Sequence, residues 1–236
     1  MSAEGGSEGA VGPLFDIAIP GTHYHLPIYD FVITSWVIMF FLAFTAFLAT
    51  KNMKRLPKGV QNVWEAIVEG LFDFIGGIMG EERARKYGPF LVTNFLFILC
   101  ANYSGMIPGA AMIRGFTPPT NNISITAGLS ILVFLSVFYF GIQAKGIGFF
   151  KHFFQPMAFL FILNVIEELV RPISLSLRLY GNIFGEEKII EELGLMVPFL
   201  VPLPMMLLGL LTGVIQAFVF TLLASTYIAG ATEEHH

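Results

Sequence analysis

Five runs of apolar residues divide this chain, and each is long enough to cross a bilayer. A transmembrane helix needs roughly 17–25 mostly apolar residues. We therefore predict an all-α polytopic membrane protein with about five membrane-embedded helices, near residues 31–50, 88–108, 124–144, 156–185 and 204–231. They form one membrane domain over 30–236, and the Gly- and Ser-rich residues 1–29 form a flexible outer segment.

Residues 59–80 follow a different pattern, that of an amphipathic helix. Six apolar residues recur there at helical spacing: Val60, Val63, Trp64, Ile67, Leu71 and Ile75. Three acids lie at other positions, four residues apart: Glu65, Glu69 and Asp73. This pattern predicts a helix on the membrane surface or against a partner, and not a span.

The last two apolar runs are too long for upright spans. At 1.5 Å per residue, 156–185 and 204–231 would measure about 45 and 42 Å as helices, against a hydrocarbon core of roughly 30 Å. We predict that they form a strongly tilted hairpin. Its turn would comprise the acidic stretch 186–194 and the proline-broken stretch 195–204, because proline disrupts a helix interior.

Composition and charge agree with a membrane location. The chain is 55% hydrophobic and 13% charged, whereas soluble domains have about 25% charged residues. Nine basic residues flank the predicted spans on one side of the membrane, and only Arg114 flanks them on the other. Because lysine and arginine are enriched on the cytoplasmic side, this places the N-terminus outside and the C-terminus in the cytoplasm. The nine are Lys51, Lys54, Arg55, Lys58, Arg83, Arg85, Lys86, Lys145 and Lys151.

Several kinds of chemistry find no support in the sequence. The single cysteine, Cys100, excludes a disulfide framework. His23 and His25 have no third metal ligand nearby, and we see no phosphate loop, zinc motif or nucleophile elbow. We expect no cofactor, no metal and no nucleic-acid partner.

The fourth predicted span carries a polar line. Glu167, Arg171, Ser174, Arg178 and Asn182 are spaced by three or four residues and share one side of a helix. Charged residues inside a membrane are costly and usually functional. Arg171 has two interpretations, a local ion pair with Glu167 and Glu168 or a functional cation.

Arg178 is the deepest charge of this line, and an arginine cannot lose its proton in proteins. Glu167 and Glu168 lie about 15 Å away along the helix, and Glu187 lies on the opposite side. No acid occurs within the other predicted spans. We therefore expect the partner of Arg178 on another protein, with a buried pair to a neighbouring span as the alternative.

The last predicted span has Gly209, Thr212, Gly213 and Gln216 on one side. Gln216 would form an interhelical hydrogen bond or lie across from Arg178. Both long helices contain G-x-x-x-G, at Gly181 with Gly185 and at Gly209 with Gly213. This motif predicts close helix packing, although alone it is weak.

The segments RPISLSLRLYGNIFGEE and GVIQAFVFTLLASTYIAGATEEH resemble subunit a of the F-type ATP synthase, and colinear features cover most of residues 15–235. The resemblance implies an ion-translocating stator subunit, not catalytic on its own, in a bacterial inner membrane. Its partners would be the c-subunit ring, the b-subunit peripheral stalk and the rest of the F1Fo complex. The expected ion is the proton, with sodium the alternative.

The resemblance also implies roles for single residues. Arg178 matches the arginine that faces the c-ring, Asn182 the asparagine one turn later, and Gln216 the glutamine opposite the arginine. Glu187, with its neighbour Glu186, matches the outer ion pathway, and Glu167 and Glu168 lie where family members carry acids on the cytoplasmic pathway. Some members have a histidine where this chain has Gly209.

Two other classes of function were weighed. A secondary transporter would use Arg178 to bind an anionic substrate, but such proteins contain inverted repeats, and we see none between the halves. An intramembrane enzyme would need paired catalytic acids or a set of metal ligands within the spans, and we identify no such set there.

A comparison of two glutamates tests the outer pathway. We expect Glu187→Gln to slow ion flow through membrane vesicles more than Glu191→Gln, because only Glu187 matches the pathway residue. Equal rates in a proton-flux assay would show that the outer pathway is placed wrongly.

Overall fold

The computed structural model describes residues 15–18, 25–51, 53–54, 58–105, 117–146, 148, 161–196 and 202–233. Most of the predicted outer segment, the start of the fourth predicted span and part of the predicted turn fall outside these residues. Within them, β1 (Phe15–Ala18) pairs antiparallel with β2 (His25–Ile28) ahead of the helices, with Phe15 opposite Ile28.

The described chain is otherwise helical, which confirms the predicted all-α class. Its helices are α1 (Asp30–Thr50), α2 (Val60–Met79), α3 (Glu81–Ser104), the short 3-10 helix η2 (Pro119–Asn121), α4 (Ile123–Lys145), α5 (Phe161–Met196) and α6 (Pro202–Thr232). The amphipathic helix expected over 59–80 corresponds to α2.

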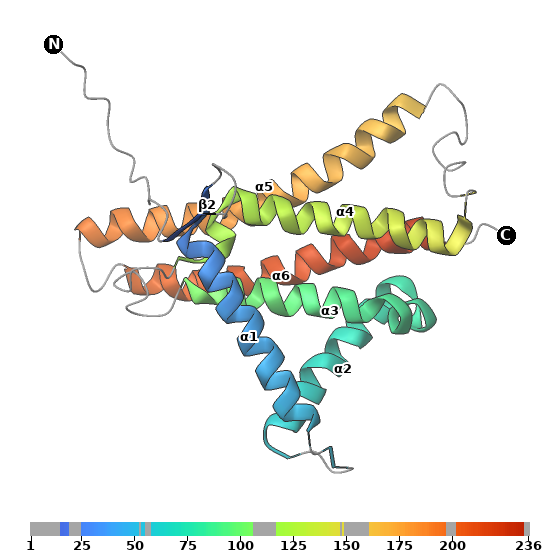
Figure 1. Cartoon of the computed structure of the whole chain (residues 1–236), viewed down its shortest axis with the longest axis horizontal. Coiled ribbons are helices and arrows are strands. Elements are labelled where there is room, and N and C mark those ends of the chain that lie inside the picture. Colours follow the sequence, from blue (N-terminus) through green and yellow to red (C-terminus); the bar gives the residue numbers. More distant parts are fainter. Residues whose placement is uncertain are drawn as a thin grey trace.

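Figure 1 shows that α3, α4, α6 and part of α5 run side by side, while α1 leaves this bundle at a steep angle and α2 returns to it. The main packing pairs are α4 with α5, α2 and α6 with α3, and α5 with α6. α5 changes direction along its length (Figure 1). Pro172 lies inside this helix, and a proline that removes a backbone hydrogen bond commonly causes such a bend.

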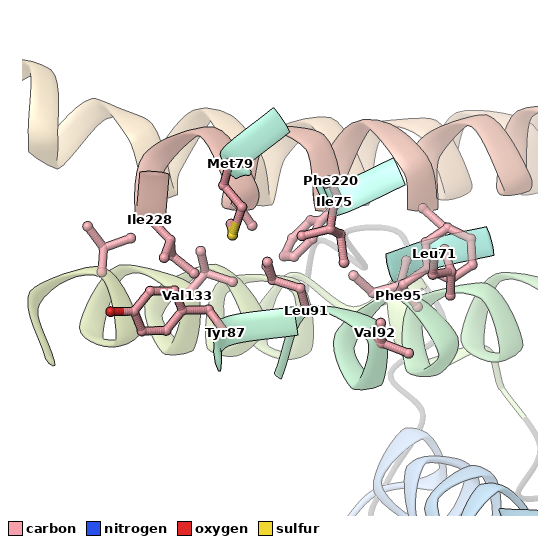
Figure 2. Packing of buried hydrophobic residues seen from close by; sticks show 14 of the residues in the cluster. Leu71, Ile75, Met79, Tyr87, Leu91, Val92, Phe95, Val133, Phe220 and Ile228 are labelled. Carbon is pink, nitrogen blue, oxygen red and sulfur yellow. The ribbon is translucent and has the colours of Figure 1, made fainter. Parts of the chain in front are cut away.

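The buried core lies where α2, α3, α4 and α6 meet, and Figure 2 shows its side chains interlocking between these helices. Ile75 and Leu91 are fully buried, as is Phe220 from α6. Gly80 separates α2 from α3 with a φ of 84°, a left-handed conformation that glycine adopts without steric cost. The two helices can therefore fold back on each other and bury the apolar face of α2.

Three described helices are long and apolar enough to cross a membrane: α1, α4 and residues 204–232 of α6. Large apolar side chains also cover the outside of the described chain, such as Phe40, which is 73% exposed. A polytopic membrane protein explains this surface, since soluble proteins rarely expose large apolar patches. α3 and α5 are more polar, so the predicted total of five spans stays a prediction.

Two helices extend beyond the apolar runs that predicted them, and one predicted turn is wrong. α3 begins at Glu81, ahead of the apolar run that starts near residue 88, and ends at Ser104. The acidic stretch 186–194, predicted as a turn, continues α5 as far as Met196. In both places charged residues interrupt the hydropathy, but Glu, Lys, Arg and Leu are good helix formers, so the helix extends beyond its apolar part.

The predicted close approach of α5 and α6 through their glycine motifs is also wrong. A Cβ atom added at Gly181 or Gly185 would meet nothing within 4 Å. Gly213 does make a close contact, but its neighbours are Asn102 and Tyr103 of α3. The glycine motif of α6 therefore serves packing against α3, and that of α5 leaves its own surface open.

Gly88 offers a test of the packing between α2 and α3. A Cβ atom there would lie 2.6 Å from a ring carbon of Phe72, so Gly88→Val should destabilise the fold by about 1–3 kcal/mol through overpacking. Gly128→Val is the matched control, because a Cβ at this helical glycine meets nothing within 4 Å. Thermal unfolding of the detergent-solubilised protein would measure both, and equal midpoints would contradict the packing.

Candidate functional site

The structure divides the polar line of α5 into three groups along one helix. Arg171 pairs with two glutamates near one end, Arg178 stands alone in the middle, and Glu186 and Glu187 contact other elements near the far end. Ten residues separate Glu168 from Arg178 and nine separate Arg178 from Glu187, or about 15 Å and 14 Å along the axis. The arginine therefore lies midway between two acidic groups.

Arg178 is exposed on the surface of the described chain and forms no ion pair or hydrogen bond with any described residue. Its helix neighbours Leu175 and Leu179 are buried, so one side of α5 faces the bundle and the other faces outward. Between residues 169 and 184 the outward side is apolar apart from Ser174 and Arg178 and carries Leu169, Val170, Ile173, Leu177 and Phe184. An unpaired cation thus lies in the middle of an apolar outward face.

Arg171 is held by partners from its own subunit. Its Nη2 donates to Oε1 of Glu167 at 2.9 Å, and its Nη1 contacts a carboxylate oxygen of Glu168. The guanidinium also lies over the ring of Tyr227 on α6, 4.9 Å from its centroid, in the geometry of a cation–π interaction. The structure therefore supports the local ion-pair interpretation of Arg171.

A small cavity lies next to this pair, between α4, α5 and α6. Its volume is about 10 Å³, and both charged and apolar side chains line it: Ser130, Val133, Phe134, Val137, Glu168, Arg171, Pro172, Leu175 and Tyr227. This volume is close to the minimum that one water molecule requires. Glu168 thus borders a space of water size inside the bundle.

Glu186 and Glu187 each contact a polar residue from another element. Oε2 of Glu186 accepts a hydrogen bond from Oγ1 of Thr212 on α6 at 3.4 Å, and a carboxylate oxygen of Glu187 accepts from Nδ2 of Asn121 in η2. Segments far apart in the sequence therefore meet at this end of α5. The predicted members Glu186, Glu187 and Thr212 belong to one cluster.

A polar hollow of about 500 Å³ opens beside Asn121. It is lined by Tyr29, Asp30, Phe31, Thr117, Pro118, Asn121, Asn122 and Ser124. Asp30, in the first turn of α1, is 8% exposed, and its Oδ1 has no hydrogen-bond partner among the described residues. Asn121 thus connects the hollow, which contains a buried acid, with Glu187 on α5.

Gln216 and Asn182 each contain a buried amide group. Nε2 of Gln216 is buried without a hydrogen-bond partner in the described chain, and so is Nδ2 of Asn182. The described hydrogen bonds join neither residue to Arg178, and none of them links Gln216 to another helix. Unsatisfied buried amides are rare and costly, which marks both positions as unusual.

Gly209 is buried, and its carbonyl oxygen accepts a hydrogen bond from Thr212 at 3.1 Å. About one turn further along α6, Nδ2 of Asn102 donates to the carbonyl of Gly213 at 3.1 Å. This bond ties α6 to α3. Gly209 and Thr212 therefore lie within the packed part of α6, close to Glu186.

Sequence reasoning missed Asp30, Asn121 and Tyr227. Asp30 directly precedes an apolar run and Asn121 lies in the loop before another, where polar residues are common. Tyr227 is one of seven tyrosines in an apolar chain. A search for polar residues at the outer ends of all predicted spans would have found the first two.

An all-α polytopic protein with charged residues along one helix belongs to the class of membrane proteins that transport ions. Comparison with known proteins identifies the family within that class. The sequence model of the ATP synthase A chain matches residues 32–229. The chain belongs to this family.

Named relatives agree over nearly the whole length. The chain is 49% identical to ATP synthase subunit a of Moorella thermoacetica, an alignment that covers 89% of this chain and 94% of the relative. It is 46% identical to ATP synthase subunit a 1 of Pelobacter propionicus, over 88% and 89%. It is also 39% identical to the chloroplastic ATP synthase subunit a of Stigeoclonium helveticum, over 96% and 97%.

Tyr227 tests how Arg171 is held against α6. Tyr227→Leu removes the aromatic face under the guanidinium and should cost about 0.5–2 kcal/mol of stability. Tyr227→Phe keeps the ring and should cost less. Thermal unfolding of the detergent-solubilised protein would measure both. If the two variants lost equal stability, the ring face would not support the arginine.

Proposed function

We propose that this chain is the ion-translocating stator subunit of the membrane motor of an ATP synthase. In this role it offers two offset half-channels and one fixed arginine to a rotating ring of c subunits. The ion is the proton, and its flow drives rotation and ATP synthesis. The chain itself catalyses no covalent step.

The exposed position of Arg178 is the observation that carries this proposal. A guanidinium on an apolar outward face is stable in a membrane only when an anionic partner meets it there. No described carboxylate of its own chain does so. A ring that brings ionised carboxylates past α5 one at a time supplies that partner repeatedly.

The two acidic ends of α5 support the half-channels. At the inner end, Glu168 borders the small cavity beside Arg171. At the outer end, the polar hollow with Asp30 leads through Asn121 to Glu187. Each end of α5 would give ions access from only one side of the membrane, since the apolar middle of the helix separates the two ends. To the predicted site we therefore add Asp30 and Asn121 as outer-channel residues.

Electrostatics explains why an arginine separates the two half-channels. Its permanent positive charge repels a proton that would pass directly from one to the other, and it stabilises the ionised carboxylate of the ring. The membrane potential contributes about 2.3 kcal/mol per charge for each 100 mV. Ions that cannot leak must move with the ring, so this free energy becomes rotation.

Orientation and partners follow from the same proposal. The N-terminus and the hollow at Asp30 lie on the outer side of a bacterial inner membrane, and the C-terminus lies in the cytoplasm. This orientation places most lysines and arginines at the helix ends on the cytoplasmic side. The c-ring packs on the outward face of α5, and the b-subunit peripheral stalk holds the chain stationary.

The structure gives no support to a secondary transporter. Such a protein binds its substrate between repeats at mid-membrane, in a site enclosed by its own helices. Arg178 instead lies on the surface of the described bundle, where a bound anion would face lipid.

Replacing Arg178 tests the proposal directly. Arg178→Ala should abolish ATP synthesis driven by a proton gradient in membrane vesicles, because the ring carboxylate loses its fixed counter-charge. ATP hydrolysis by the soluble head should stay measurable, since its catalytic sites are on other subunits.

Arg85→Ala is the matched control. Arg85 is an exposed arginine near the start of α3, outside the proposed pathway, and its replacement should leave synthesis near the wild-type level. Coupled synthesis that survives in Arg178→Ala, with the complex assembled, would contradict the proposed role of the arginine.

A further inference from the structure

An apolar groove lies between α1, α2 and α3, away from the charged line of α5. Figure 1 shows α1 leaving the bundle and α2 returning to it, so that the two helices form a V that opens toward α3. The groove has a volume of about 390 Å³ and is lined by Ala46, Ala49, Thr50, Met53, Gln61, Trp64, Glu65, Val68, Phe72, Pro89, Val92, Thr93 and Leu96. Nothing in the ion pathway proposed above uses this space.

Most of the groove wall is apolar, and its few polar groups are largely satisfied internally. Gln61 accepts a hydrogen bond from the backbone N–H of Lys54 at 3.1 Å and donates to its carbonyl at 3.0 Å. It also donates to Glu65, the single acid of the lining, at 2.7 Å. These bonds fix the chain after α1 against α2, and leave an apolar interior suited to hydrocarbon.

One end of the groove is positively charged. Lys51, Lys54 and Lys58 follow the last turn of α1, and all three are exposed. Lys54 is bonded through its backbone to the lining residue Gln61, and Lys51 directly follows the lining residue Thr50. An apolar groove with a cluster of lysines at one end matches a molecule with a hydrocarbon chain and an anionic head.

We propose that this groove binds one anionic phospholipid, with an acyl chain between α1, α2 and α3 and its phosphate at the lysines. The basic residues place this end at the cytoplasmic surface, where anionic lipids attract lysine and arginine clusters. Basic pockets between transmembrane helices on this side are a known type of lipid site. The lipid would fill the groove and brace α1 against the bundle.

The length of the groove suits an acyl chain. The part of α2 that lines the groove spans residues 61–72, about three turns or roughly 18 Å along the helix axis. A hydrocarbon chain is narrow and flexible, so it can follow a groove of this length.

The experiment uses the intact ATP synthase complex in nanodiscs with a photo-activatable phosphatidylglycerol. Cross-linked peptides are identified by mass spectrometry, and photo-activatable phosphatidylcholine serves as the zwitterionic comparison. Phosphatidylglycerol should label residues in 46–53, 61–72 and 89–96, and phosphatidylcholine should label them several-fold less. Equal labelling by both lipids would overturn the proposal.

Two sets of variants separate the lipid head from its chain. Lys51→Gln with Lys54→Gln should weaken phosphatidylglycerol labelling by on the order of tenfold, because each lysine near an anionic lipid contributes appreciably to binding. Lys145→Gln with Lys151→Gln removes equal charge after α4 and should change nothing. Thr93→Trp, at an exposed lining residue, should block labelling by filling the groove.

Unchanged labelling in both the lysine variant and Thr93→Trp would overturn the site. So would a cysteine cross-link from position 49 to a transmembrane helix of a stalk subunit in most complexes, since that helix would then occupy the groove. ATP-driven proton pumping, measured alongside, keeps this result separate from the role of Arg178, because the lipid site can fail while coupling persists.

Discussion

One unpaired guanidinium governs the organisation of this protein. Arg178 cannot lose its proton, and no described carboxylate of its own chain neutralises it. Leu175 and Leu179 are buried against the bundle, so the rotation of α5 that satisfies packing also turns Arg178 outward. The same helix therefore has a structural side and a charged side, and its charge is complete only in an assembly.

The rest of the fold keeps other charges away from that arginine. Glu167 and Glu168 are engaged by Arg171, which Tyr227 supports from α6. At the opposite end, Thr212 and Asn121 contact the outer acids. Because α5 is one continuous helix, these groups cannot move toward Arg178 without unfolding it. A long rigid element is thus the simplest means of holding three charged groups at fixed separations.

Much of this could be predicted from the sequence. The apolar runs, the amphipathic α2 and the line of polar residues follow from hydropathy and helical spacing, and each appears in the structure near its expected place. The errors fall where a local signal has two meanings. The stretch 186–194 is acidic like a turn but is made of helix formers, and the glycines of α6 favour close packing without specifying α3 as the partner.

By itself, the sequence determined that the chain is a membrane protein, where the apolar parts of its helices lie, and that Arg178 lacks a partner on its own helix. These properties depend on residues close together in the chain or on composition. Only the tertiary structure decided which side of α5 faces outward, that Asn121 contacts Glu187 beside a hollow lined by Asp30, and that a groove opens between α1, α2 and α3. Such features arise where distant segments meet, and side-chain packing between helices has no periodic signature in any one of them.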